Sequence, residues 1–539
     1  PQEGIWASHA SRSEASLRRF FFERLRCSVL GLIIVVFSID TVARSLRCMI
    51  QSRIMSVLYL LLALVCFNGL ACLLQAAESR PDWHTSDSAQ ELRRDMKHRP
   101  NIVFVITDDQ RWDQLGYTGH PVLKTPNIDR IAHEGASFNN FFVTTPLCSP
   151  SRASFLTGLY PHTHRVYNND KLGIDVVSHT LMTFPRQLRE QGYETAYIGK
   201  WHMGLDDSRR PGFDSWISFK GQGIYIDGVV NDNGTRRQLR GNMTDYLNRR
   251  AVEFVNQLHE KPFCLYLGHK AVHSPFLPAK RHEELYSDYE FQIPPRDKAD
   301  LAGKPVLKRQ LNKNNHLELE GIGPEPGEPR RGRGRDPQSI VRDQLRCLAS
   351  VDEGVGQLFA ALESTGELDN TIFIYTSDNG FFMGEHGSFN GKRMPYDEAL
   401  RVPFFIRYPE LIKSGSIRED LVLNIDLAPT LLELAGVESV IAMHGKSFVP
   451  LFKDARASWR EAFLAEYFLE KVARRTPSWQ AVRSSDWKYV HYPKFGDMDE
   501  LYSLKSDPKE LKNLVNHPKH QNRLTEMKAQ LEGLLNQFN

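Results

Sequence analysis

The sequence contains few cysteines for its length. Seven occur among 539 residues, and four of these lie within the first 77 positions. The other three, Cys148, Cys264 and Cys347, are unevenly spaced, which excludes a disulfide framework even in an exported protein. Cys264 lies in a buried-strand pattern and Cys347 in a helical pattern, whereas Cys148 has no evident packing role.

The chain also lacks a strong charge of either sign. Its 68 basic and 65 acidic residues leave a net charge of +3, so the composition gives no reason to expect a nucleic acid as a partner. No internal repeat is visible. A hydrophobic content of 41% over this length is sufficient for one large domain and a smaller one.

Long hydrophobic runs are scarce as well. The run Cys27–Ile39 is too short to span a bilayer comfortably. The stretch from Met55 has a basic residue before it, an apolar centre and small residues at its end, which predicts a signal peptide over 55–77. Residues 1–54 are then either a start-site miscall or the first part of a two-part membrane anchor. We expect export, membrane contact only through this signal or anchor segment, and a linker over 78–98.

From residue 99, buried-strand and helical patterns alternate, which predicts an α/β domain with a doubly wound, mostly parallel sheet over 99–455. The strand patterns occupy 101–107, 194–199, 263–268, 371–376 and 403–408. The helical patterns lie near 126–135, 181–191, 244–258, 338–365 and 426–436. Three short alternating strands (W-Q-A-V-R, K-Y-V-H-Y and E-L-Y-S-L) and a helix from about His520 predict a smaller antiparallel α+β subdomain over 456–539.

One segment interrupts this alternation. Residues 321–337 are rich in glycine, proline and arginine, which predicts a surface loop. The loop is either a solvated insertion or an arginine-bearing lid over an anionic substrate.

Polar side chains follow two of the predicted strands. Asp108 and Asp109 come directly after the first strand, and Asp378 and Asn379 follow the strand at 371–376. If the two strands are neighbours, their carboxyl ends bring these side chains together at the edge where ligands bind. Hard oxygen ligands of this kind suit Ca²⁺ or Mg²⁺ better than zinc. Taken singly, each motif is more typical of a turn or a helix cap than of a metal site, and it is the matched pair that favours a metal.

The stretch around Cys148 predicts the start of a helix. Ser149 is a suitable cap, Pro150 suits the first turn and Gly158 suits the end. Cys148 then lies where backbone N–H groups favour negative charge, with Arg152 one turn further on. We therefore expect a depressed thiol pKa and a candidate nucleophile, with a plain structural cysteine as the alternative.

The stretch C-S-P-S-R-A-S-F-L-T-G resembles the signature of the type I sulfatases, in which the cysteine of C-x-P-x-R is oxidised to formylglycine. I-T-D-D-Q is similar to the family's first metal pair and T-S-D-N-G to its second. Three further segments are similar to parts of the family's active site. G-K-W-H-M-G aligns Lys200 and His202 with active-site positions, K-A-V-H-S-P-F aligns His273, and G-K-R-M-P-Y-D-E-A-L-R-V-P aligns Lys392. The resemblance covers residues 99–515 and implies an alkaline-phosphatase-like fold.

The resemblance also implies how a sulfuric ester would be hydrolysed. One hydroxyl of the hydrated aldehyde at position 148 attacks sulfur, and the second expels sulfate afterwards, which a thiol or serine could not do in that way. Arg152, Lys200 and Lys392 would neutralise the sulfate oxygens. His273 would protonate the leaving alcohol, and His202 would support the formylglycine hydroxyls.

The implied cofactor is Ca²⁺, with Mg²⁺ as the alternative. Its implied ligands are Asp108, Asp109, Cys148 in its modified form, Asp378 and Asn379. The implied partners are a formylglycine-generating maturation enzyme and a sulfated carbohydrate substrate.

The motifs are most similar to the branch that contains N-acetylglucosamine-6-sulfatases and mucin-desulfating sulfatases. His162, His164, Asn168 and Asn169 would line a sugar pocket or simply form a polar surface loop. Two other functions stay open. One is a phosphate or phosphonate monoester hydrolase of the same superfamily, and the other is a catalytically inactive glycan-binding surface protein.

Overall fold

The structure is a computed structural model that describes residues 99–169, 173–294, 301, 303–307, 336–387, 389–454, 457–470, 473 and 476–538. The predicted extension, signal peptide and linker, and residues 321–335 of the predicted loop, lie outside the described residues. No helix in the described ranges is both long enough and apolar enough to cross a membrane.

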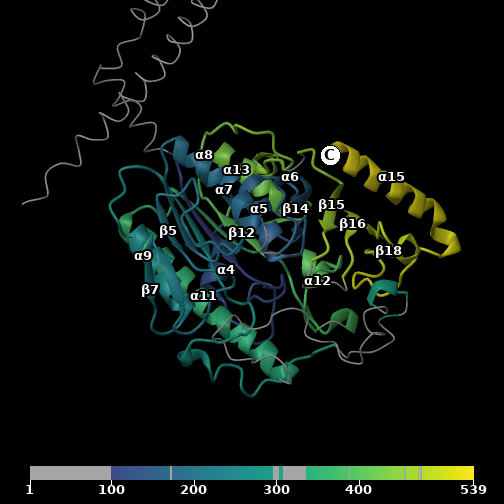
Figure 1. The fold of residues 1–539 in the computed structure, drawn as a ribbon, viewed down its shortest axis with the longest axis horizontal. Helices are drawn as coiled ribbons and strands as arrows, with labels where there is room; N and C mark the ends of the chain where they lie inside the picture. The colour runs from purple at the N-terminus through teal and green to yellow at the C-terminus, as the bar shows by residue number, and fades with distance from the viewer. Residues whose placement is uncertain are drawn as a thin grey trace, which may run out of the picture. The chain divides into compact units, whose positions relative to one another are not determined.

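The main domain is built on a ten-stranded sheet (Figure 1). The strand order is β13-β2-β12-β9-β1-β8-β4-β5-β6-β7. The bounds are β1 Asn101–Thr107, β2 Ala136–Phe138, β4 Glu194–Gly199, β5 Ser215–Ser218, β6 Val229–Asp232, β7 Thr235–Gln238, β8 Phe263–Gly268, β9 Thr371–Ser377, β12 Phe404–Arg407 and β13 Ser416–Arg418. The central strands β9, β1, β8, β4 and β5 run parallel, which confirms the predicted sheet.

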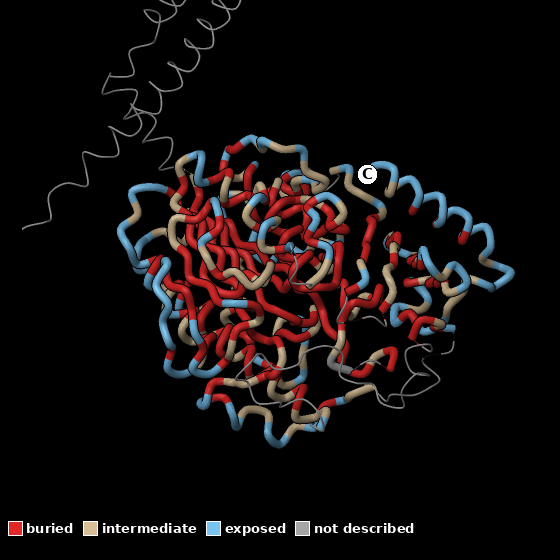
Figure 2. Tube along the Cα trace, viewed as in Figure 1, coloured by how far each residue is buried: buried red, intermediate tan, exposed pale blue. Residues whose placement is uncertain are grey.

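The central strand β1 shows why the sheet is buried on both faces. Ile102 and Phe104 belong to one buried apolar cluster, whereas Val103 and Val105 belong to another. Side chains alternate between the two faces of a strand, so a continuous apolar run places half of its members on each side. Figure 2 shows the result as a buried sheet beneath more exposed outer segments.

Helices cover both faces. The second cluster lies under α4 (Pro126–Glu134), α9 (Met243–Val255) and α11 (Pro337–Thr365). The first lies under α5 (Cys148–Thr157), α8 (Phe184–Glu190) and α13 (Leu427–Leu434). These bounds confirm the five predicted helices within a few residues.

The edges of the sheet depart from the predicted pattern. The apolar run at 403–408 forms β12, which is antiparallel to both β9 and β2. The β6–β7 hairpin extends the opposite edge, and it lacks the buried-strand pattern because all four residues of β7 are exposed. The apolar run at 403–408 therefore predicted that β12 is buried, but it did not predict the direction of this strand.

The C-terminal region forms a separate four-stranded antiparallel sheet, in the order β15-β16-β17-β18. Its bounds are β15 Ala462–Tyr467, β16 Trp479–Ser484, β17 Trp487–His491 and β18 Glu500–Ser503. Helix α15 (Gln521–Phe538) runs along this sheet (Figure 1). The smaller antiparallel subdomain is confirmed, although β15 was not among the predicted strands. The boundary near residue 455 stays a prediction.

Buried polar contacts hold this sheet against the main domain. The ammonium of Lys488 in β17 is fully buried and lies 2.6 Å from the Asp397 carboxylate and 2.7 Å from the Glu510 carboxylate. A second set of contacts involves His162 in α6 (Pro161–His164). Its Nδ1 lies 2.9 Å from Glu466 Oε1 in β15, and its Nε2 lies 2.9 Å from the Phe538 carbonyl.

The contacts of His162 predict a pH-dependent contribution to stability. Burial disfavours the charged imidazole, but the Glu466 carboxylate and the Phe538 carbonyl raise the pKa of His162 above its ordinary value. A raised pKa in the folded state stabilises the fold below the ordinary value of about 6.5, and this contribution is lost as the pH rises through the folded-state value. We expect the difference in unfolding free energy between wild type and His162→Gln to be larger at about pH 5.5 than at about pH 8.5. Urea unfolding at both pH values measures it.

His164→Gln is the matched control. Burial lowers the pKa of His164 to about 3, so its contribution should change with pH in the opposite direction. A difference for His162→Gln that is the same at both pH values would contradict the assignment of a charged His162.

Candidate functional site

The site forms where β1 and β9 end side by side. Thr107 and Ser377 are paired in register, so the next residues of both strands meet at the carboxyl edge of the sheet. The Asp109 amide N–H donates to Asp378 Oδ1 at 3.2 Å, and Asn379 Nδ2 donates to Asp109 Oδ1 at 2.7 Å. The predicted adjacency of the two strands is therefore confirmed.

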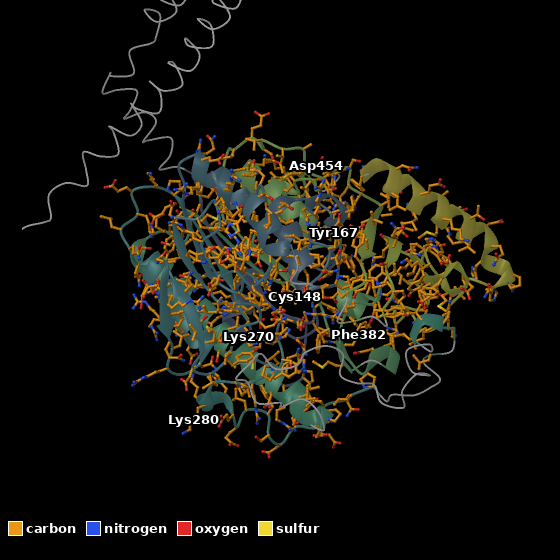
Figure 3. The ribbon with its side chains drawn as sticks, viewed as in Figure 1. Cys148, Tyr167, Lys270, Lys280, Phe382 and Asp454 are labelled. Carbon is orange, nitrogen blue, oxygen red and sulfur yellow. The ribbon has the colours of Figure 1, made fainter. Side chains whose placement is uncertain are left out.

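Cys148 enters this edge from the first turn of α5 and is fully buried. Its Sγ lies 3.2 Å from Asp108 Oδ1 and 2.7 Å from Lys392 Nζ. Figure 3 labels Cys148 within the body of the main domain. The thiol therefore stands between a carboxylate and an ammonium rather than in an apolar contact.

Three details of the predicted helix start can now be compared with the structure. The helix begins at Cys148 itself, with Leu147 before it and no side-chain cap, so the predicted Ser149 cap is wrong. The Ser149 hydroxyl instead donates to the His202 carbonyl at 2.7 Å. Gly158 ends the helix in the left-handed region with φ 70°, as predicted.

The predicted depressed pKa of the Cys148 thiol is also wrong. Burial and the negative charge of Asp108 raise this pKa, and the positive charges of Lys200 and Lys392 do not compensate. The helix N-terminus suggested a thiolate, but desolvation outweighs that effect at a fully buried position. Unmodified Cys148 is thus a poor nucleophile in this structure.

Three cationic side chains face the three carboxylates of the site. Arg152 Nε lies 2.8 Å from Asp378 Oδ2, Lys200 Nζ contacts Asp108, and Lys392 Nζ contacts Asp109. All six side chains are at most 3% exposed. Each carboxylate of the described cluster therefore has one cationic partner in a region with little water.

The carboxylates nevertheless differ from one another in acidity. Burial opposes ionisation throughout, but Lys200 holds the pKa of Asp108 well below its usual range. Burial raises the pKa of Asp109, and burial together with the charge of Asp108 raises that of Asp378 to about 7. Asp108 is consequently the carboxylate most strongly held in its charged form.

The residues fit a hard divalent cation. Asp108, Asp109, Cys148 and Asp378 each offer one ligand atom, and these atoms lie within 4.8 Å of one another. Asp109 Oδ2 is a buried acceptor without a hydrogen-bond partner among the described residues. The Lys392 ammonium contacts Asp109 and Cys148 and lies 3.5 Å from Asn379 Oδ1, so three of the predicted ligands already converge on a positive charge.

Two histidines complete the surroundings of Cys148. His273 Nδ1 donates to the Ser274 carbonyl at 2.7 Å, which leaves its Nε2 without a proton and facing Asp109 Oδ2 at 3.8 Å. Burial lowers the pKa of His273 and of His202. His202 contacts Ser149, with its Nδ1 3.4 Å from the Ser149 hydroxyl.

The four residues suggested for a sugar pocket all make contacts within the chain. His162 pairs with Glu466, and His164 Nε2 lies 3.1 Å from the Ser154 hydroxyl. Asn168 donates to the Leu469 carbonyl at 3.2 Å. These contacts do not support a sugar pocket at the first three residues, but His162 and His164 lie in α6, where His164 is buried, rather than in a surface loop.

The fourth residue, Asn169, lies next to the segment that carries Cys148. Its Oδ1 accepts from the Ser149 N–H at 3.0 Å, one residue from Cys148. The sequence analysis did not identify two further residues near the site, Arg393 and Glu470. Arg393 directly follows Lys392 in the G-K-R-M-P motif, so the sequence contained a signal for it. No pattern marked Glu470, which accepts from the Asn169 N–H at 3.2 Å.

Comparison with known families gives two matches. A family model described as Sulfatase matches residues 100–437. A second, described as N-sulphoglucosamine sulphohydrolase, C-terminal, matches residues 384–537. Together they include the β1 and β9 edge, Cys148 and the C-terminal sheet.

Several curated proteins are similar over most of the chain. The N-acetylglucosamine-6-O-sulfatase of Bacteroides thetaiotaomicron is 32% identical over 505 residues, covering 84% of this chain and 89% of that protein. The human N-acetylglucosamine-6-sulfatase is 30% identical, covering 77% of this chain and 81% of the human protein. The Drosophila melanogaster extracellular sulfatase SULF-1 homolog is 30% identical over 74% of this chain, which spans only 36% of that protein.

Solved structures agree on the fold. One, a protein in complex with its substrate D-glucosamine-2-N,6-O-disulfate, has a TM-score of 0.73 and 32% identity, covering 82% of this chain and 98% of that chain. The phosphonate monoester hydrolase of Agrobacterium radiobacter has a TM-score of 0.67 at 23% identity, covering 82% of this chain and 96% of that one. At that identity the likeness concerns the alkaline-phosphatase-like fold alone.

The Sulfatase match covers more than half of the 539 residues, and a relative at 32% identity covers 84% of them. The chain therefore belongs to the sulfatase family and is a sulfuric ester hydrolase.

Proposed function

We propose that this chain removes sulfate from a sulfated carbohydrate, with a 6-sulfated N-acetylglucosamine or a similar sugar sulfate as substrate, after Cys148 has been converted to formylglycine. One observation carries the proposal. Residue 148 of the C-S-P-S-R motif stands at the carboxyl edge of β1, between the Asp108 carboxylate and the Lys392 ammonium. A thiol with a raised pKa is poorly suited to attack there, which is consistent with Cys148 being a precursor of the reactive group.

The balance of charge supports an anionic substrate. Three buried carboxylates face three buried cations, so a divalent metal ion gives the centre an excess of positive charge. Ca²⁺, with Mg²⁺ as the alternative, would be held by Asp108, Asp109, Asp378, Asn379 and residue 148. When bound, the metal neutralises negative charge on the sulfate oxygens.

The remaining side chains are assigned by their positions. Arg152, Lys200 and Lys392 are held by carboxylates at the edge where the sulfate oxygens would bind, so they stabilise the developing charge. His273 is held through Nδ1 by the Ser274 carbonyl, so its Nε2 is directed into the cluster, and this atom would have to take up a proton before passing it to the leaving alcohol. His202 anchors the Ser149 hydroxyl beside residue 148.

The substrate and location rest on the relatives. Two N-acetylglucosamine-6-sulfatases are 32% and 30% identical to this chain, and the protein solved with D-glucosamine-2-N,6-O-disulfate is 32% identical to it. We extend their substrate class, a 6-sulfated glucosamine, to this chain. Export, a maturation enzyme that acts on Cys148 and the signal peptide over 55–77 are part of the same proposal, and one relative is named as extracellular.

The first prediction concerns the leaving group. Protein produced with a formylglycine-generating enzyme should release sulfate from N-acetylglucosamine-6-sulfate with a kcat/KM at least about tenfold above that for the 6-phosphate, and mass spectrometry should find residue 148 oxidised to the aldehyde. Cys148→Ala is the matched control and should have no activity. Preference for the phosphate would favour a phosphomonoester hydrolase, and an unmodified thiol with no turnover would favour the inactive glycan-binding alternative.

The second prediction concerns the metal. Asp378→Ala should reduce turnover on the order of 100-fold or more, because a ligand is lost and the Arg152 charge is left unbalanced. Ca²⁺ added to chelator-treated wild type should raise its melting temperature, since a ligand that binds only the folded state stabilises it, and the variant should lose this shift. Exposed Asp497→Asn is the control and should keep both properties. Normal turnover of Asp378→Ala in the presence of a chelator would overturn the metal assignment.

A further inference from the structure

A carboxylate from the C-terminal subdomain contacts residues that lie next to the site. Glu470 follows β15 and is fully buried. Its Oε1 accepts from the Asn169 N–H at 3.2 Å, and its Oε2 contacts Arg393 Nε and accepts from the Tyr467 hydroxyl at 3.2 Å. Two of these partners, Asn169 and Arg393, belong to the main domain, and each is next to or bonded to a neighbour of Cys148.

The first connection runs to the helix that carries Cys148. Asn169 uses its N–H toward Glu470 and its Oδ1 toward the Ser149 N–H, at 3.2 Å and 3.0 Å. The Ser149 N–H is one of the N-terminal donors of α5 that have no partner within the helix. Glu470 therefore fixes, through one residue, the backbone directly after position 148.

The second connection runs to the lysine that contacts Cys148. Arg393 follows Lys392, whose Nζ lies 2.7 Å from Cys148 Sγ. The backbone of Arg393 has φ 84°, a left-handed conformation that residues other than glycine rarely adopt, so it persists only where surrounding contacts hold it. Glu470 holds the guanidinium, and the Trp479 indole N–H donates to the Arg393 carbonyl at 2.8 Å.

We propose that Glu470 is a positioning residue for the sulfatase reaction: it sets the distance between position 148 and the Lys392 ammonium by holding Asn169 and Arg393 at once. The inference rests on the proposed function, because it concerns the alignment of the reactive group at position 148 with the charge that stabilises the sulfate. Misplacement of reacting groups by about 1 Å can cost about 100-fold in rate. Glu470 contacts neither Cys148 nor Lys392 in the structure, so its effect is indirect.

The test compares Glu470→Gln and Glu470→Ala with wild type, each matured to formylglycine. The glutamine variant retains an acceptor for Asn169 but loses the charge that holds Arg393, whereas the alanine variant loses both. We expect kcat per formylglycine-bearing molecule to fall about 10-fold for Glu470→Gln and about 100-fold for Glu470→Ala, with KM changed by less than about threefold. Counting only matured, folded molecules removes the effect of reduced yield.

Asp499→Asn is the matched control. Asp499 is also a buried carboxylate of the C-terminal subdomain, and it accepts from the Tyr492 N–H at 3.1 Å and contacts the Tyr489 hydroxyl and His491, all within that subdomain. Its replacement should lower the melting temperature but leave kcat per matured molecule unchanged. Equal losses of kcat in Asp499→Asn and Glu470→Gln would overturn the proposal, because general destabilisation would then explain both.

A double-mutant cycle with Asn169→Ala separates positioning from independent effects. If both residues act on the backbone after position 148, the loss in Asn169→Ala/Glu470→Ala should be smaller than the product of the single losses. Multiplicative losses would contradict the shared route. A wild type without sulfatase activity would refute the proposed function, whereas an active wild type with an equally active Glu470→Ala would refute only the role of Glu470.

Discussion

The structure depends above all on the burial of opposite charges at one edge of a sheet. Three carboxylates would be very costly to bury alone, and they are stable there because Arg152, Lys200 and Lys392 lie against them. These cations come from a helix and two loops on different parts of the chain, so their placement requires most of the main domain. The parallel strands provide the fixed point, because adjacent β1 and β9 end at the same level.

The same constraint explains why a sulfatase has this arrangement rather than a strongly basic pocket. A site with unpaired cations would be costly to bury without substrate, whereas cations paired with carboxylates are less costly to bury, and a bound divalent ion would add positive charge. In the proposed function, selectivity for an anionic ester would then depend on occupancy by the metal. The C-terminal subdomain contributes as well, since Glu470, which follows β15, contacts Asn169 and Arg393 near Cys148.

Much of this could be predicted from the sequence, where the relevant forces are local or repeat along a strand. Continuous apolar runs identified the central strands, and the residues after them identified the carboxyl edge. The direction of β12 could not be predicted, because apolar runs of either direction look alike. The thiol pKa of Cys148 was predicted wrongly because helix position is visible in sequence, whereas burial beside Asp108 is not. Glu470 carried no signal because its partners in the main domain, Arg393 and Asn169, are 77 and 301 residues away.

These separations have a consequence for the order in which the protein is made. Asn169 meets Glu470 only after 301 further residues have been added, and His162 meets the Phe538 carbonyl only after 376. At a synthesis rate of about 5–20 residues per second, about 15–60 seconds pass between the synthesis of Asn169 and that of Glu470. In the finished fold Cys148 is fully buried. The contact of Cys148 with Lys392, and that of Asn169 with Glu470, can therefore form only after these later segments have been made.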